Sequence, residues 1–191
     1  MNKRFLYILF LTLSMCFTQV HAKFIIELAT NFSSEEDNVD NFTFSRFDFR
    51  GFLGASLDGE GAVYFGQSIY SGSREHKTSS GTTITVSSLE VGPKMSIFMG
   101  ASKSIYISVA WHPYAKGERK TEAGTTEDIS GSSLLGSLGY QLKLTKTFYL
   151  GASLNYHKFS VSKYTNTSDQ EFEVTDEYTT ISPMIDISLR F

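Results

Sequence analysis

Charged residues occupy only one of the two faces that alternate along the strand-like segments of this chain. The last segment shows the pattern. Counted back from Phe191, every second residue to Ile181 is apolar, while Asp186 and Arg190 fall in the opposite phase. Successive side chains of a β-strand point to opposite faces, so a segment of this kind has one apolar and one polar face. The chain is therefore expected to form a sheet whose two faces differ sharply in polarity.

Eight segments have strand character, and none has a convincing helical period. They are residues 24–32, 42–57, 61–71, 83–99, 104–115, 129–144, 148–162 and 178–191. Their connections alternate between tight turns (DGEG, GASK and TKT) and long polar stretches. This alternation predicts an all-β fold, an eight-stranded antiparallel up-and-down transmembrane β-barrel with short periplasmic turns and long extracellular loops.

The position of the charges favours lipid over water outside this barrel. When the more apolar phase of each segment is taken, that phase contains no charged residue. Such an absence is expected of a face in contact with lipid, because a cation there costs about 2 to 4 kcal/mol at mid-bilayer. The other phase should then face the interior, where charges must be paired. We expect a lumen network drawn from Glu27, Arg46, Asp48, Arg50, Glu90, Lys94, Asp186 and Arg190. A soluble lipocalin-like barrel with the apolar phase inside is the alternative.

The amino terminus has the features of a secretory signal peptide. Lys3 and Arg4 precede an apolar run that ends at VHA, so we expect residues 1–22 to be removed and residues 23–191 to form one barrel domain. Cys16 lies in LSMC, which is similar to a lipobox, but Met15 stands where a smaller residue is usual, so lipidation is the lesser alternative. Residues 23–191 contain no cysteine and carry 15 basic against 20 acidic residues. Disulfides and nucleic-acid binding are therefore not expected.

The chain resembles the small eight-stranded outer-membrane barrels, such as the OmpA transmembrane domain and the OmpX-like proteins, over residues 23–191. Its ending, MIDISLRF, is similar to their C-terminal assembly signal, with Leu189 and Phe191 in the apolar positions and Asp186 where glycine is usual. The resemblance implies an outer-membrane location and recognition by the barrel-assembly machinery. Aromatic residues near the strand ends fit interfacial girdles. They are Trp111, Tyr114, Tyr156, Phe159 and Tyr178 at the long-loop end, and Phe148 and Phe191 at the other.

Eight strands enclose an interior that side chains just fill, so a wide pore is not expected. The sequence favours a non-enzymatic role, either stabilising the envelope or acting at the surface through the loops, without a cofactor. A narrow channel or hydrophobic-solute conduit and a lipid-modifying enzyme are the alternatives. Catalytic residues are not expected, because His157 and Ser160 would lie on opposite faces of their strand, with His112 in the lumen and His76 in a loop.

The loops suggest partners at the outer surface. Acidic residues crowd the first and the last long loops, where they could bind divalent cations and so bridge to lipopolysaccharide. They are Glu35, Glu36, Asp37 and Asp40 in the first, and Asp169, Glu171, Glu173, Asp176 and Glu177 in the last. We expect a monomer. All three prolines fit poorly, because Pro93, Pro113 and Pro183 fall within predicted strands, and bulges are the expected solution.

Overall fold

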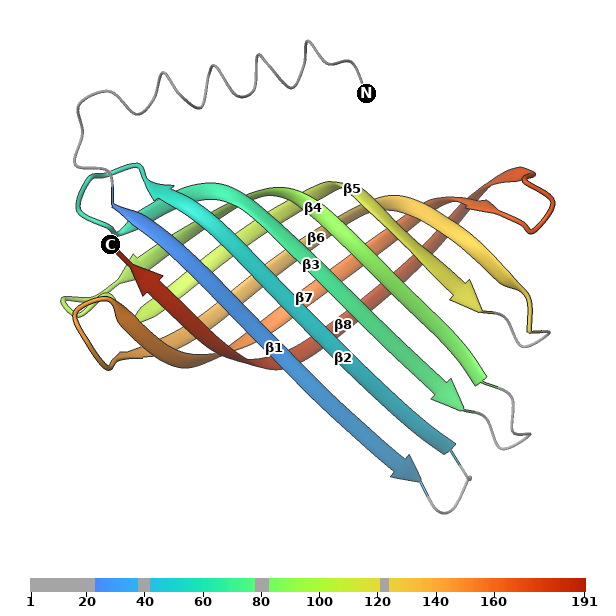
Figure 1. The fold of residues 1–191 in the computed structure, drawn as a ribbon, viewed down its shortest axis with the longest axis horizontal. Coiled ribbons are helices and arrows are strands. Elements are labelled where there is room, and N and C mark those ends of the chain that lie inside the picture. Colours follow the sequence, from blue (N-terminus) through green and yellow to red (C-terminus); the bar gives the residue numbers. More distant parts are fainter. Residues whose placement is uncertain (1–22, 38–41, 78–82, 121–123) are drawn as a thin grey trace, which may run out of the picture.

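The computed structural model describes residues 23–37, 42–77, 83–120 and 124–191. Within them, eight antiparallel strands close into a barrel in which each strand pairs with its neighbour in sequence and the last pairs with the first (Figure 1). The predicted fold class is confirmed. The described residues include no helix long and apolar enough to cross a bilayer. The strands are β1 (Phe24–Asp37), β2 (Phe42–Ser56), β3 (Val63–Lys77), β4 (Thr83–Met99), β5 (Ile105–Lys120), β6 (Thr126–Lys143), β7 (Phe148–Thr165) and β8 (Glu171–Arg190).

The polarity of the barrel is the reverse of that of a water-soluble protein. Large apolar side chains such as Leu138 and Ile185 are exposed on the outer wall, whereas Glu27, Arg50 and Glu90 are fully buried inside. Burial alternates residue by residue along the strands, as in β8 from Ile181 to Arg190. The phase assignment made from the sequence therefore matches the inner and outer faces of the barrel.

The strands extend well beyond their predicted ends at one end of the barrel. β5 continues to Lys120, β8 begins at Glu171, and His76 lies in β3 instead of a loop. These extensions have polar residues on both faces, so they lack the alternation that identifies a half-buried strand. Their backbones still pair, and ion pairs such as Lys158 to Glu177, at 2.7 Å, join neighbouring strands on the outer face.

Two of the three prolines meet at one irregularity between β4 and β5. The register of this pair shifts between Val91 and Lys94, and β5 carries an extra residue where its pairing with β6 shifts between His112 and Ala115. Along a strand, successive residues direct their backbone hydrogen bonds alternately to the strand on one side and to the strand on the other. Because Phe98 donates its N–H to Ala62 O, just before β3, the backbone N position of Pro93, five residues earlier, faces β5. The missing N–H of Pro93 thus points at the bulge that contains Pro113, as expected for proline within a sheet.

The third proline, Pro183, lies where the pairing of β1 with β8 ends. Phe24 and Phe191 exchange both backbone hydrogen bonds, and bonded pairs recur at every second residue. The pairing reaches Thr30 and Ile185, and the next bonded position would oppose Phe32 to Pro183. Pro183 has no N–H to donate there, so the seam between β1 and β8 stops while β7 stays paired with β8 as far as Glu171. The two strands separate toward the far end (Figure 1).

Candidate functional site in the barrel interior

Four buried charges from four strands form the centre of the interior. Arg50 Nη2 lies 2.8 Å from Glu27 Oε1 and 3.0 Å from Asp186 Oδ1, and Lys94 Nζ lies 2.8 Å from the same Glu27 oxygen. The hydroxyl of Tyr106 donates to Asp186 Oδ2 at 2.7 Å. Two cations thus balance two carboxylates, which is the condition for keeping charges out of water.

Both ends of the Arg50 fork are used. Its Nη1 group donates to Ser137 Oγ at 2.6 Å and to Asn155 Oδ1 at 2.5 Å, so the guanidinium links β2 to β6 and β7 as well as to the two carboxylates. A planar guanidinium can hold several acceptors in fixed directions, which a lysine cannot. Arg50 therefore ties opposite walls of the barrel together.

A second charge pair lies closer to the end of the barrel where the strands extend. Arg46 Nε is 2.5 Å from Asp48 Oδ2, and the Tyr70 hydroxyl donates to Asp48 Oδ1 at 2.5 Å. The Nη2 group of Arg46 donates to the hydroxyls of Thr180 and Ser182, at 3.1 and 3.3 Å. These bonds join β2 to β8 from inside, next to the level where β1 and β8 part.

A third cluster surrounds Glu90, whose partners are histidines and not the lumen cations. His157 Nε2 lies 2.9 Å from Glu90 Oε2, and His112 Nδ1 lies 3.5 Å from the same oxygen. Ser133 donates to this carboxylate and lies 2.9 Å from His112 Nδ1. Sequence phase placed His112 and His157 in the lumen without linking them to Glu90.

Ser68 completes an arrangement with the components of a serine hydrolase. Its Oγ lies 2.8 Å from His112 Nε2, and the other ring nitrogen of that histidine faces Glu90. A nucleophile must also be reachable by its substrate and have donors for the developing oxyanion. All three side chains are buried, and the Ser68 hydroxyl also lies 3.2 Å from Gly92 O. The cluster is closed to an acyl substrate in this conformation.

Arg190 differs from the other predicted lumen cations. Its guanidinium donates to Gln141 Oε1 at 2.6 Å and to Lys103 O at 2.9 Å, and in the described part of the chain no carboxylate lies within ion-pair distance of it. All eight residues predicted for the network are buried. Seven of them belong to three separate groups, around Arg50, Asp48 and Glu90, and Arg190 forms no ion pair within the described residues.

The aromatic residues predicted for the girdles divide between the two faces. Trp111 and Tyr156 lie exposed on the outer wall, and Phe148 is half-buried at the short-turn end. Phe159, by contrast, belongs to a buried cluster inside the barrel, and Tyr178 packs against that cluster. The girdle assignment was wrong for these two, because position along a strand does not determine which face a residue occupies.

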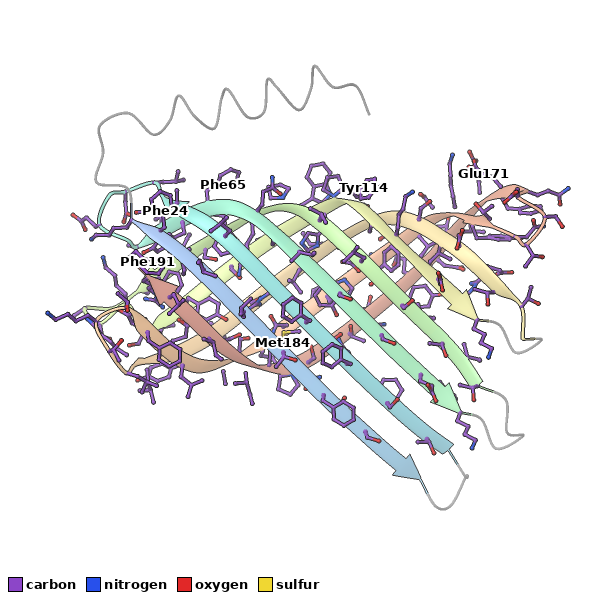
Figure 2. The ribbon with its side chains drawn as sticks, in the orientation of Figure 1. Phe24, Phe65, Tyr114, Glu171, Met184 and Phe191 are labelled. Carbon is purple, nitrogen blue, oxygen red and sulfur yellow. The ribbon has the colours of Figure 1, made fainter. Side chains whose placement is uncertain are left out.

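The predicted assembly signal lies on the closing strand. Leu189 is half-buried, and Phe191 is exposed beside Phe24 at the short-turn end of the barrel (Figure 2). The predicted signal peptide, with Cys16, lies outside the described residues. Nothing about its removal follows from the barrel.

Several of the acids predicted to bind divalent cations are paired with basic side chains. Asp40 lies outside the described residues, and no group of three or more potential metal ligands occurs in the part of the chain that the structure describes. The pairs are Glu171 with Lys163 at 3.4 Å, Asp176 with Arg119 at 3.0 Å and Glu177 with Lys158 at 2.7 Å.

Sequence reasoning missed the neutral members of these groups. Ser137, Asn155 and Ser133 lie at inward positions of β6 and β7, where alternation alone would have placed them in the lumen. No motif marks them as ligands of Arg50 or Glu90. Their partners depend on how the strands are staggered around the barrel, and this stagger is not a local property of the sequence.

No protein-family model matches the sequence, and a comparison with curated proteins finds no match. Similar solved structures include Neisserial surface protein A, with 11% identity over 89% of this chain and 99% of that chain, at a TM-score of 0.47. A major outer membrane protein from Thermus thermophilus has 11% identity over 89% of this chain and 99% of that chain, at a TM-score of 0.45. The β domain of the Bordetella autotransporter BrkA has 10% identity over 89% of this chain and 98% of that chain, at a TM-score of 0.44. At these values the similarity is one of shape alone, and the barrel is defined by the pairing of this chain's own strands.

Proposed function

We propose that this chain is a non-enzymatic bacterial outer-membrane β-barrel that stabilises the envelope and presents its strand extensions at the cell surface. The observation that carries the proposal is the distribution of charge. Each buried acid of the interior lies against a basic side chain, behind an outer wall of apolar side chains such as Leu138, Leu154 and Ile187. Such a wall is stable in lipid and would be a large exposed apolar surface in water.

The filled interior supports a structural role over conduction. The groups around Arg50 and Glu90 link strands across the lumen, so an aqueous path would require several buried ion pairs to separate. The narrow channel is the second candidate, and planar-bilayer recordings test it. Steps of conductance above the background would favour a gated path through these groups.

The proposed partners are outer-membrane lipid and lipopolysaccharide, with the barrel as a monomer. Exposed lysines such as Lys116, which lies over the ring of Tyr114, are suited to lipid phosphates at the level of the outer girdle. Divalent cations could add to this contact at the acids of the first loop. We further propose that Leu189 and Phe191 are read by the barrel-assembly machinery.

The membrane proposal is tested by fractionation after expression in a Gram-negative host. The protein should appear in the outer-membrane fraction and change its gel mobility on boiling. Leu138→Arg, at an exposed apolar position of β6, should reduce the folded band, because the cation costs about 2 to 4 kcal/mol in lipid.

The matched control is Thr179→Arg, at an exposed position of β8 two residues from Ile181 on the loop side. It should leave the folded band unchanged. A soluble protein without heat-modifiable mobility, or equal effects of the two arginines, would contradict membrane insertion.

A further inference from the structure

A strongly basic cavity lies at the short-turn end of the barrel. Its volume is about 360 Å³, and Tyr64 and Tyr149 are among its lining residues. Five basic side chains and one acidic side chain, Glu60, line it together with the terminal residue Phe191. The basic residues are Lys23, Lys103, Lys143, Lys146 and Arg190. This end therefore differs from the interior, where acids and bases are balanced.

The cavity contains a buried cation that forms no ion pair within the described residues. The Arg190 guanidinium lies between the rings of Phe98 and Tyr149, 3.8 and 4.0 Å from their centroids, and its side chain is only 8% exposed. Its protein partners in the described part of the chain are neutral oxygens, and its Nε has no partner there. A buried charge without a close ion-pair partner is costly, so an anion in the cavity would stabilise it.

The turns hold further cations close together. Lys23 Nζ donates to Glu60 O at 2.7 Å, and Lys103 Nζ donates to the same carbonyl oxygen. Lys103 itself has φ of 52°, a left-handed conformation that is uncommon for a side chain of this kind. Strained backbone of this type clusters at ligand sites. Here it brings one ammonium group and the carbonyl that binds Arg190 to the same cavity.

A glycine lets two side chains that line the cavity lie close to the backbone. Gly61 has φ of 79°, and a Cβ at this position would lie 2.7 Å from Tyr64 Oη and 3.2 Å from Lys23 Cδ. Gly59, in the same turn, has φ of 65°, but a Cβ there would meet nothing within 4 Å. Both glycines relieve backbone strain, but only Gly61 also allows Tyr64 and Lys23 to approach the backbone this closely, so a methyl group there would displace them.

We infer that this cavity binds a phosphate-class anion, either a free phosphate or pyrophosphate or the phosphate of a lipid headgroup. A multiply charged anion can compensate several cations at once, whereas a single carboxylate leaves most of them uncompensated. The set combines one arginine fork with point charges from lysines, the combination that proteins use for phosphate. The inference is independent of any role of the loops at the opposite end.

Isothermal titration of the full chain, folded in zwitterionic detergent, with inorganic pyrophosphate is the first test. Saturable binding that weakens with added salt is expected. Lys143→Gln and Lys146→Gln should each weaken it by up to about fivefold, the effect of a partly exposed ion pair. Lys120→Gln, at the exposed end of β5 on the long-loop side, should leave it unchanged. Arg190 is left intact, because its removal could prevent folding.

Gly61→Ala tests the cavity itself, with Gly59→Ala as the matched control for backbone strain. Both variants are first checked for heat-modifiable mobility. Gly61→Ala should lose most of the pyrophosphate affinity, and Gly59→Ala should keep it. Equal behaviour of the two alanine variants, or equal loss in Lys120→Gln and Lys146→Gln, would overturn the inference.

A lipid arm distinguishes the two sources of phosphate. The barrel is placed in nanodiscs of mixed phosphatidylcholine and phosphatidylglycerol, and the lipid retained after detergent extraction is measured. Selective retention of phosphatidylglycerol that is lost in Gly61→Ala, without binding of pyrophosphate, identifies a headgroup as the ligand. Binding of neither probe overturns the inference.

Discussion

Arg50 is the side chain on which charge pairing in the interior depends most. Replacing it by methionine removes a cation that contacts two carboxylates, Glu27 and Asp186, and leaves both of them buried. Breaking a buried ion pair by removing one partner costs about 3 to 5 kcal/mol. We expect Arg50→Met to lower the free energy of unfolding by this amount, which is a large part of the stability of a small domain.

The two carboxylates should not contribute equally to this loss. Glu27 keeps Lys94 at 2.8 Å, whereas Asp186 keeps only neutral donors, the hydroxyls of Tyr106 and Ser153 at 2.7 and 3.0 Å. Most of the cost should therefore arise from Asp186. Adding Asp186→Asn to Arg50→Met should recover part of the stability, with a coupling of about 0.5 to 3 kcal/mol between the two positions.

Urea unfolding in lipid vesicles, followed by the fluorescence of Trp111, measures these differences. Trp111 is the single tryptophan and lies exposed on the outer wall, so its emission reports contact with lipid. The control is Arg119→Met, which removes the half-exposed ion pairs with Glu127 and Asp176 and should cost no more than about 1 kcal/mol. Equal losses for Arg50→Met and Arg119→Met would refute the reasoning.

Three further predictions concern the backbone. Gly92→Ala should strongly destabilise the barrel in the same unfolding assay, because its Cβ would collide with a backbone carbonyl of β5, while Gly136→Ala, with open space, should be nearly neutral. Pro183→Val supplies an N–H opposite Phe32, so hydrogen exchange should show a protected amide at residue 183; rapid exchange would argue against proline as the cause of the open seam. In the first short turn, hydrogen bonds from a serine hydroxyl and from backbone N–H groups lower the pKa of Asp58 below its usual 3.8. The stability from these bonds is present above the unfolded pKa and lost as pH falls through the lower folded pKa, so Asp58→Asn should destabilise at neutral pH and not in strong acid.

The number of strands and the choice of inner face could be predicted from the sequence because both depend on a local period of two. The pattern fails where water lies on both sides of the sheet. Residues 171–177 form the start of β8, although their composition is typical of a loop. Phe159 and Tyr178 show a related limit, since an aromatic residue near a strand end can face either lipid or the packed interior.

The partners of the interior charges could not be predicted, for a different reason. Alternation shows that Glu27 and Arg50 both face inward, but their backbones are not opposite each other, because Glu27 pairs with Phe52 and Arg50 with Ala29. Contacts inside a barrel depend on the stagger of the strands and on side chains that cross the lumen, as Lys94 does to reach Glu27. Only a folded barrel determines that Glu90 meets two histidines and that the acceptors of the Arg190 guanidinium in the described part of the chain are neutral oxygens.

The prolines and the short turns share a physical explanation. In a closed barrel in lipid, the backbone N–H and C=O groups are hydrogen-bonded because every strand is paired on both sides. A residue that interrupts this pairing must therefore be accommodated by a local change of the sheet. A single bulge between β4 and β5 accommodates both Pro93 and Pro113, neither of which has a backbone N–H. Pro183 lies where the pairing of β1 with β8 ends. The left-handed Lys103 and the exposed Asp58 belong to turns outside the sheet. Local rules fail most often where a structure has a function, and the basic cavity that Lys103 lines is therefore the first of these places to test.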